Sequence, residues 1–232
     1  MIPKIIKFAC KHEYLTFPQS AKKYIPEWYK NAERFVGGKP RMNEDYPLGA
    51  KTFKMCSPFL DSLTSGYIVE LWQDVFIEQT PHGTTAKWNT KPDVIGGNSK
   101  ETTVGLPIPA GHDENTRFVW EFPFVFQTPK GYSVLLTHPF NRHDLPFTTM
   151  TAVIDSDGGI QSGRIPFFLN KEFNGIIKAG TPIIQILPFK RENWKSEEDK
   201  SILHIEKRNQ FFTNRVTHGF YKYSMWRKKN YD

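Results

Sequence analysis

The segment from His138 to Asp144 holds the densest group of side chains that could do chemistry. It follows an apolar, strand-like run, and residues at strand ends often lie at a rim where ligands gather. Imidazole and carboxylate groups can ligate a metal, but their spacing here matches none of the common metal motifs. We therefore expect a hydrogen-bonded loop that binds a ligand, with no metal and no cofactor; a metal-dependent site on His138 and His143 is the alternative. The candidate ligand-binding residues of this loop are His138, Asn141, Arg142, His143 and Asp144.

Residues 150–189 form the longest segment whose local structure and chemistry can both be interpreted. Aspartates and glycines at residues 155–159 predict a turn, since Asp side chains bond the backbone and glycine adopts positive φ. Apolar, β-branched runs at residues 165–169 and 183–187 predict buried strands. The segment therefore predicts a meander of short strands.

This segment resembles the third and fourth motifs of the dUTPase and dCTP deaminase superfamily, whose fold is a β-clip. The matching residues are Asp155 and Asp157 in the turn, then Asn170, Gly180 and Gln185. The resemblance implies that Asp155 is catalytic and activates the attacking water, and that Asn170 and Gln185 line a ligand pocket. It also implies a homo-oligomer, because β-clip relatives often form trimers.

The chain departs from this family pattern at several positions. Gly158 stands where the family has the tyrosine that floors the base pocket, and residues 137–142 stand where its serine-rich phosphate motif should lie. We therefore expect a protein without an intact catalytic site. A nucleotide hydrolase or deaminase relative, with Asp155 activating water, is the alternative function.

A wider pattern resembles an uncharacterised family of phage-encoded proteins. The matching segments are Cys-Ser-Pro-Phe at residues 56–59, residues 126–133 and residues 180–191. The resemblance implies a phage-type binding or assembly protein, virion-associated or in the host cytoplasm. Its implied partner is a second copy of the chain or another phage protein.

Composition indicates the fold class. The 232-residue chain contains 19 Phe, 9 Tyr and 6 Trp, together with 17 Pro and 16 Gly. Many aromatic residues between frequent turn residues are typical of short strands. We expect one mainly β domain over residues 1–232, a β-clip-like or jelly-roll-like sandwich with a short N-terminal helix and an amphipathic C-terminal helix. No stretch reaches the ~20 apolar residues of a membrane span, so we expect a soluble protein.

Individual elements can be placed from local signals. Residues 18–34 predict a short helix broken at Pro26, and residues 80–83 predict a turn between two hairpin strands. Pro123 predicts a bulge or an edge position within residues 118–126, while residues 132–136 form the best candidate for a central strand.

Other chemical motifs are few. The sequence contains no serine nucleophile elbow, P-loop or Rossmann fingerprint. Cys10 and Cys56 lack a CxxC spacing, and we interpret both as buried thiols of a reducing compartment. His112 precedes two acids, and we interpret this cluster as the start of a strand.

Charge is distributed unevenly. The basic N-terminal segment, residues 1–41, has nine basic and three acidic side chains, and residues 190–232 have eleven and six. Residues 42–189 have eleven basic and fifteen acidic side chains, so a mildly acidic β core, residues 42–195, has basic ends. We interpret these ends first as solvated termini and second as a weak contact surface for nucleic acid.

The C-terminal region departs from the β pattern. Residues 196–218 predict an amphipathic helix, with Ser196 as its cap and an apolar stripe at three- and four-residue steps. We expect this helix to pack on its own domain. A tail that interleaves aromatic and basic residues follows at residues 219–232.

Overall fold

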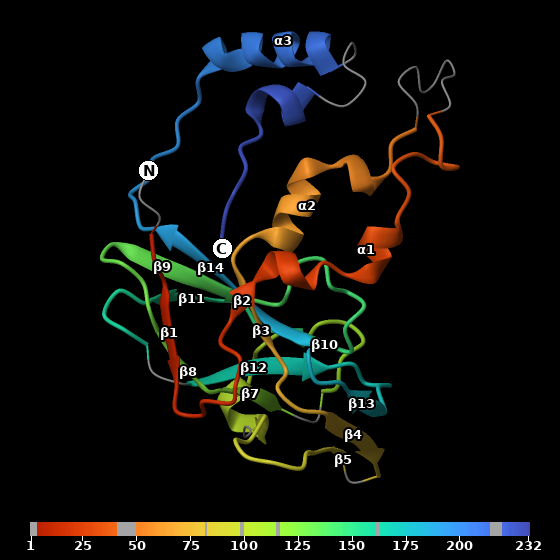
Figure 1. Cartoon of the computed structure of the whole chain (residues 1–232), viewed down its shortest axis with the longest axis vertical. Coiled ribbons are helices and arrows are strands. Elements are labelled where there is room, and N and C mark those ends of the chain that lie inside the picture. The colour runs from red at the N-terminus through yellow and green to blue at the C-terminus, as the bar shows by residue number, and fades with distance from the viewer. Residues whose placement is uncertain are drawn as a thin grey trace. The chain divides into compact units, whose positions relative to one another are not determined.

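The chain forms two compact units rather than the single domain expected over residues 1–232. The computed structural model describes residues 4–40, 50–81, 83–97, 100–114, 117–160, 163–213 and 220–232. Unit 1 comprises Met1–Lys23 and Gly66–Arg191, and unit 2 comprises Tyr24–Ser65 and Glu192–Asp232. The basic C-terminal segment thus lies almost wholly in unit 2, whereas the basic N-terminal segment is divided between the two units (Figure 1).

Unit 1 contains the β-structure, and all its strand pairs are antiparallel. The five-stranded sheet has the order β11 (Ala152–Asp155), β9 (Tyr132–Thr137), β14 (Pro182–Lys190), β3 (Tyr67–Glu70) and β2 (Gln19–Ser20). The four-stranded sheet has the order β10 (Phe147–Thr149), β12 (Gly163–Leu169), β7 (Phe118–Phe122) and β6 (Ile95–Gly97). Smaller sheets pair β1 (Lys7–Cys10) with β8 (Phe124–Gln127), and β4 (Val75–Thr80) with both β5 (Gly83–Lys87) and β13 (Gly175–Ile177). The expected mainly β fold is confirmed.

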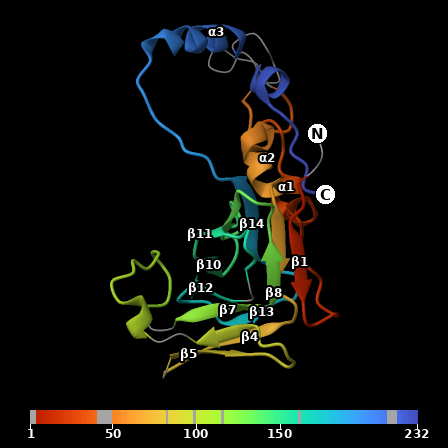
Figure 2. The same ribbon diagram turned by 90° about the vertical axis from the view of Figure 1, so that its left-hand side faces the viewer.

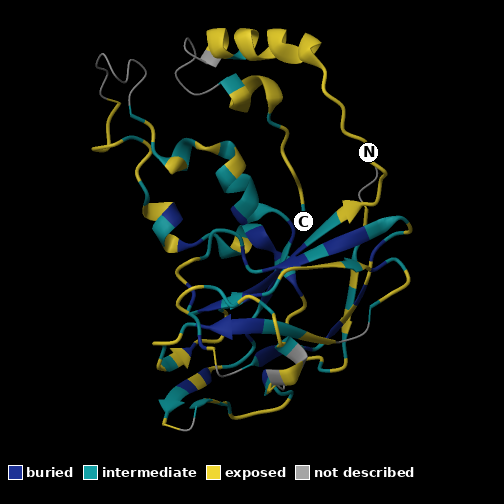
Figure 3. Cartoon of the chain, turned by 180° about the vertical axis from the view of Figure 1, so that it is seen from behind, coloured by how far each residue is buried: buried dark blue, intermediate teal, exposed yellow. Residues whose placement is uncertain are grey.

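An aromatic core lies where these sheets pack. Trp120 of β7 stacks on Phe167 of β12 with ring centroids 3.8 Å apart, and Phe147 of β10 meets both rings edge-on. Strand β14 contributes Ile184 and Ile186, both fully buried, to the same cluster. Burial of each such aliphatic side chain stabilises the unit by about 2 kcal/mol. Figure 2 shows that β7 and β12 run across the direction of β14. Strand β14 is buried over its first five residues and exposed at its end, where Figure 3 draws it in yellow.

Several local predictions are confirmed in unit 1. Strand β9 is central, between β11 and β14, and β4 pairs with β5 in the expected hairpin. Residues 118–126 are divided at Pro123 into β7 and β8, which belong to different sheets. Proline has no N–H to donate to a ladder, so the chain changes sheet there.

Unit 2 is built from short helices around an aromatic cluster. Its N-terminal part contains α1 (Glu27–Asn31), the 3₁₀ turn η2 (Phe53–Met55) and α2 (Ser57–Thr64). The expected short N-terminal helix is thus present; the 3₁₀ turn η1 (Ala21–Tyr24) precedes Pro26, and α1 follows it. The rings of Trp28, Tyr29, Phe53 and Phe59 contact one another, with Tyr29 stacked on Phe59 at 5.9 Å.

The C-terminal helix begins later in the sequence than expected. Ser196 is not its cap: Asp199 accepts from the Ser201 N–H at 2.8 Å and begins the 3₁₀ turn η4 (Lys200–Ile202), which continues as α3 (Leu203–Thr213). A π-helical turn, η5 (Tyr221–Met225), follows, and Phe220 stacks on Phe212 at 5.1 Å. Residues 214–218 of the expected helix lie outside the described residues.

The apolar stripe of this helix is not buried within unit 2. Ile202, Ile205 and Phe212 are 56%, 37% and 40% exposed, and α3 is exposed along nearly its whole length (Figure 3). Packing of the stripe on its own unit, as expected from the sequence, is therefore wrong. None of the helices described is long and apolar enough to cross a membrane.

The two cysteines lie in different units, and both are free thiols. Cys10 of β1 is half-buried, but Cys56, directly before α2, is exposed. The interpretation of both as buried thiols is therefore wrong for Cys56.

Candidate functional site

A pocket of about 560 Å³ in unit 1 contains three of the predicted ligand-binding residues, His138, His143 and Asn170. His138 and His143 belong to the loop after β9, and Asn170 follows β12. His112 joins them from the segment before β7. The wall also includes Gly111, Leu145, Phe147, Thr148, Lys171, Glu172 and Phe173.

Backbone hydrogen bonds bring these segments together. His112 pairs with Asn170 in an isolated antiparallel bridge, and the Lys171 N–H donates to the carbonyl oxygen of Gly111 at 3.0 Å. The Asn170 N–H in turn donates to the carbonyl oxygen of Pro146 at 2.9 Å. The pocket is therefore formed by three loops that are distant in the sequence.

His138 is held as a neutral imidazole. Its Nδ1 accepts from the Thr149 N–H at 3.3 Å, so Nε2 carries the hydrogen and donates to the carbonyl oxygen of Arg142 at 3.0 Å. Burial lowers the pKa of His138 below its usual value of 6.5, although the hydrogen bond to Arg142 opposes this effect. Both ring nitrogens are thus occupied, and His138 shapes the loop.

His112 is oriented in a similar way. Its Nδ1 lies 3.2 Å from the carbonyl oxygen of Pro109 and 3.1 Å from that of Ala110, so Nδ1 carries the hydrogen. Nε2 then accepts from the hydroxyl of Thr148 at 2.9 Å. Neither His112 nor His138 presents a free lone pair, and the described residues contain no group of three or more His, Cys, Asp or Glu that could hold a metal.

The remaining predicted residues of the loop hold its conformation and do not line this pocket. Arg142 donates twice to Asp144, at 2.8 and 2.9 Å, and Asn141 adopts the left-handed conformation with φ of 59°. Gln185 is buried on β14, and its side-chain oxygen accepts from the Phe140 N–H at 2.8 Å. The sequence placed Asn141, Arg142, Asp144 and Gln185 at a ligand; the structure gives them positioning roles instead.

Four polar side chains of the pocket remain available to a ligand. The side chains of His143, Asn170, Lys171 and Glu172 have no polar partner among the residues that the structure describes. They surround an apolar surface formed by Leu145, Phe147 and Phe173. A concave apolar surface with a few polar groups around it is typical of a small-ligand site.

Asp155 lies away from this pocket. It is at the end of β11 opposite Ser133 of β9, and His138 lies five residue steps further along the chain from Ser133. At the rise of an extended strand this is about 17 Å. Of the three residues that the sequence assigned to one site, only Asn170 lines this pocket.

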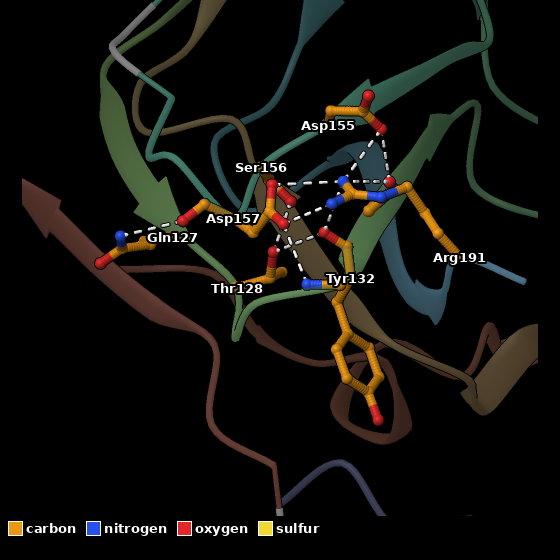
Figure 4. Close-up of polar contacts among 9 residues, drawn as sticks. Gln127, Thr128, Tyr132, Asp155, Ser156, Asp157 and Arg191 are labelled. Atoms are coloured by element: carbon orange, nitrogen blue, oxygen red, sulfur yellow. Dashed lines mark hydrogen bonds and ion pairs between the residues drawn. The ribbon is translucent and has the colours of Figure 1, made fainter.

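The Asp155 carboxylate is already paired (Figure 4). It accepts from the Ser133 hydroxyl at 2.6 Å and lies 3.2 Å from Nη1 of Arg191. The hydrogen bond from Ser133, together with Arg191, lowers the pKa of Asp155 below its usual value. The side chain is 72% exposed, so this anion faces solvent on the side not occupied by Arg191.

Asp157 is the second carboxylate of the same cluster, and it also pairs with Arg191. Hydrogen bonds from Arg191 and from the Gly131 N–H, the latter at 2.9 Å, lower the pKa of Asp157 to about 2. Between the two aspartates, Ser156 is buried and its hydroxyl lies 2.8 Å from that of Thr128 (Figure 4). The Asp155–Ser156–Asp157 turn therefore ties the end of β14 to the turn before β9.

Sequence reasoning missed the roles of His112, Thr148, Lys171 and Glu172 in the pocket. The only signal was the histidine-acid cluster at residues 112–114, which was interpreted as the start of a strand. In the structure the Asp113 N–H pairs with the Leu169 carbonyl oxygen at 2.8 Å, and this contact brings His112 to the pocket.

No protein-family model matches this chain, and no curated protein matches its sequence. Its function therefore has to be inferred from its pockets, ion pairs and exposed surfaces.

Proposed function

We propose that this protein acts by binding and assembly, as a β-rich phage-type protein, and not as a nucleotide hydrolase. Its proposed partners are a second copy of the chain or another phage protein, and nucleic acid through the basic ends. The proposed location is the virion or the host cytoplasm. The phage assignment rests on the sequence resemblance at residues 56–59, 126–133 and 180–191.

The exposed apolar surface of the C-terminal segment carries this proposal. Trp194 is 87% exposed in the extended stretch before η4, and Leu203 and Phe211 are also exposed on α3. Several large apolar side chains exposed on one segment favour a contact with another molecule, because burying them would be favourable. The segment therefore supports a partner that covers α3.

A second copy of the chain is the partner that we favour. Residues 190–232 carry more basic than acidic side chains, and residues 42–189 carry more acidic than basic ones. The C-terminal segment of one copy is thus complementary in charge to residues 42–189 of another copy. Charge complementarity of this kind favours encounter and fixes the orientation of partners.

The pocket at His112, His138 and His143 adds support for a binding role. His138 and His112 are both hydrogen-bonded to the backbone, and polar side chains without a partner among the described residues line the pocket together with apolar ones. A pocket that combines apolar surface with a few available polar groups supports recognition of a ligand.

The self-association test uses light scattering coupled to size-exclusion chromatography over a range of protein concentrations. We expect wild type to form an oligomer, and the triple change Ile202→Ser, Leu203→Ser and Phe211→Ser to make it monomeric. The matched control replaces Val104 and Val153, two exposed valines of unit 1, with Ser, and it should leave the oligomer intact. A wild-type monomer at every concentration would overturn self-association as the function of α3.

The hydrolase alternative has its own test. The pairing of Asp155 with Ser133 and Arg191 supports a structural role for this carboxylate, because both contacts lower its pKa and so make it a weaker base. We expect no pyrophosphate or ammonia release from deoxyuridine and deoxycytidine triphosphates. Turnover by wild type that Asp155→Asn abolishes would instead establish the hydrolase.

A further inference from the structure

Unit 2 contains a cavity of about 550 Å³ that none of the predicted site residues lines. One wall comes from the segment around η2 and the start of α2, including Arg34, Lys54 and Cys56. The other wall comes from Lys222, Tyr223 and Trp226 at η5. Two segments of the chain that are separated by more than 150 residues thus form one concave surface within unit 2.

The cavity is lined by cations that are free to bind an anion. Within the described part of the chain, the side chains of Arg34 and Lys222 have no polar partner. Lys54 is different, because its ammonium group donates to the carbonyl oxygens of Tyr29 and Lys30. Two cations with unused donors therefore face this cavity.

The carboxylate in the wall does not neutralise these cations. Asp61 accepts from the indole N–H of Trp226 at 2.9 Å and also pairs with Lys229. Its charge is thus compensated, and its contacts hold the η5 segment against α2. Arg227 and Lys228 follow directly in the sequence and add further positive charge to the same end of the chain.

The cavity also presents aromatic rings. Tyr223 is 65% exposed, so a face of its ring is available to a planar ligand. The ring of Tyr29 is already covered, because Lys54 Nζ lies 4.4 Å from its centroid and Phe59 stacks on it. Tyr223 is therefore the ring in this cavity on which a planar ligand can stack, and the hydrogen bond to Asp61 holds Trp226 in the same cavity wall.

We propose that this cavity binds single-stranded nucleic acid. Arg34 and Lys222 contact backbone phosphates, and one base stacks on Tyr223. Exposed aromatic rings beside free cations are the combination that binds single strands without sequence preference, since every base has a stacking face. Bases in a duplex are already stacked on one another, so a single strand is preferred. The proposal rests on the binding function proposed above, but it is independent of self-association through α3.

The first test measures fluorescence anisotropy of a labelled ten-nucleotide oligothymidine with the full-length protein over a salt series. Loss of two phosphate contacts reduces the magnitude of the slope of log affinity against log salt concentration by about 1.4. At 0.1 M salt this corresponds to an affinity about 25-fold lower. We expect this result for the double change Arg34→Ala and Lys222→Ala. Tyr223→Leu should weaken binding about tenfold with an unchanged salt slope.

The matched control removes the same charge elsewhere. Lys7 and Lys130 are exposed lysines that line one depression of unit 1, and both are changed to Ala. We expect near wild-type affinity for this variant. An equal loss in the control and in the cavity variant would overturn the proposal, because binding would then depend only on net charge.

A second measurement locates the site in the wild-type protein and does not depend on any variant folding. Cys56 lines the cavity and is exposed, while Cys10 in unit 1 is half-buried. We expect saturating oligothymidine to slow alkylation of Cys56 about tenfold and to leave that of Cys10 unchanged. Undiminished reaction of Cys56 at saturation, or no binding at low salt, would overturn the proposal. Both outcomes are independent of oligomeric state, so this proposal and the assembly proposal can fail separately.

Discussion

The backbone N–H of Thr149 donates a hydrogen bond to Nδ1 of His138 at 3.3 Å. The hydroxyl of the same threonine accepts from the indole N–H of Trp120 at 3.0 Å and donates to the carbonyl oxygen of Ile183 at 2.7 Å. Thr149 thus links the pocket histidine to the aromatic core and to β14. The pocket and the packing of the sheets depend on one another through this residue.

Thr149→Val should lower the free energy of unfolding by about 2–4 kcal/mol, because it leaves the buried N–H of Trp120 and the oxygen of Ile183 without partners. Urea unfolding measures the change. Thr149→Ser keeps the hydroxyl and should lower the free energy of unfolding by less than Thr149→Val does. Thr151→Val is the matched control, since Thr151 is exposed and bonds only Thr137, and about 0.5 kcal/mol is expected. Equal effects at positions 149 and 151 would contradict the linking role.

Stability should fall in mild acid because of His138. Burial lowers its pKa below 6.5 in the folded protein, so the unfolded chain binds a proton first as pH falls below 6.5. The free energy of unfolding then decreases by at most about 1.4 kcal/mol per pH unit until the folded pKa is reached. Urea midpoints for wild type and His138→Gln at about pH 7.5 and about pH 5.5 measure the effect. The variant should show a smaller difference between the two pH values, and an identical difference would contradict the assignment.

The Asp157–Arg191 ion pair should contribute stability that is lost only at strongly acidic pH. The pKa of Asp157 is lowered from 3.8 to about 2, so the contribution is complete above 3.8 and disappears as pH falls towards 2. Asp157→Asn and Arg191→Met should each lower the melting temperature, and the double variant should lower it by less than the sum. Thermal melts of wild type, the two single variants and the double variant at neutral pH complete this double-mutant cycle. Strictly additive effects would show that the two side chains do not couple.

Gly66→Ala should be among the most destabilising single changes in unit 1. Gly66 has φ of +73°, and a Cβ there would lie 2.1 Å from the carbonyl oxygen of Ile186. The left-handed conformation alone costs about 1–2 kcal/mol, and the backbone clash adds to it. Gly180→Ala is the matched control, since φ is +82° but nothing lies within 4 Å of its Cβ. Urea unfolding should show a larger loss at Gly66 by at least about 1 kcal/mol, and equal losses would argue against the close approach to β14.

Much of the fold of unit 1 could be predicted from local patterns. Strands β9 and β14 were recognisable because their apolar, β-branched runs lie between turn residues, and the β4–β5 hairpin because a turn separates two strand-like runs. Pro26 and Pro123 interrupt their elements for a reason that is purely local, the missing N–H and the fixed φ of proline. Even so, the start of the C-terminal helix was placed too early, because a serine that could act as a cap at residue 196 does not exclude a later start at Asp199.

The candidate site was only partly predictable. The sequence identified His138, His143 and Asn170, but it grouped Asn170 with Asp155 and Gln185 instead of with His112. That grouping depended on which strands pair, and strand pairing between distant segments has no local signature. The exposure of α3 was also unpredictable, because an amphipathic stripe shows that a surface can be buried but does not identify what covers it.

The sequence by itself determined the strand-forming runs, their proline and glycine boundaries, and the basic character of both chain ends, since these follow from side-chain shape, backbone freedom and charge. Only the tertiary structure decided that residues 24–41 and the C-terminal segment share unit 2, that His112 and His138 line one pocket, and that Arg191 pairs with both Asp155 and Asp157. The physical reason is that hydrogen-bond registers and aromatic packing join residues far apart in the chain, and their free energy depends on all partners being in place together.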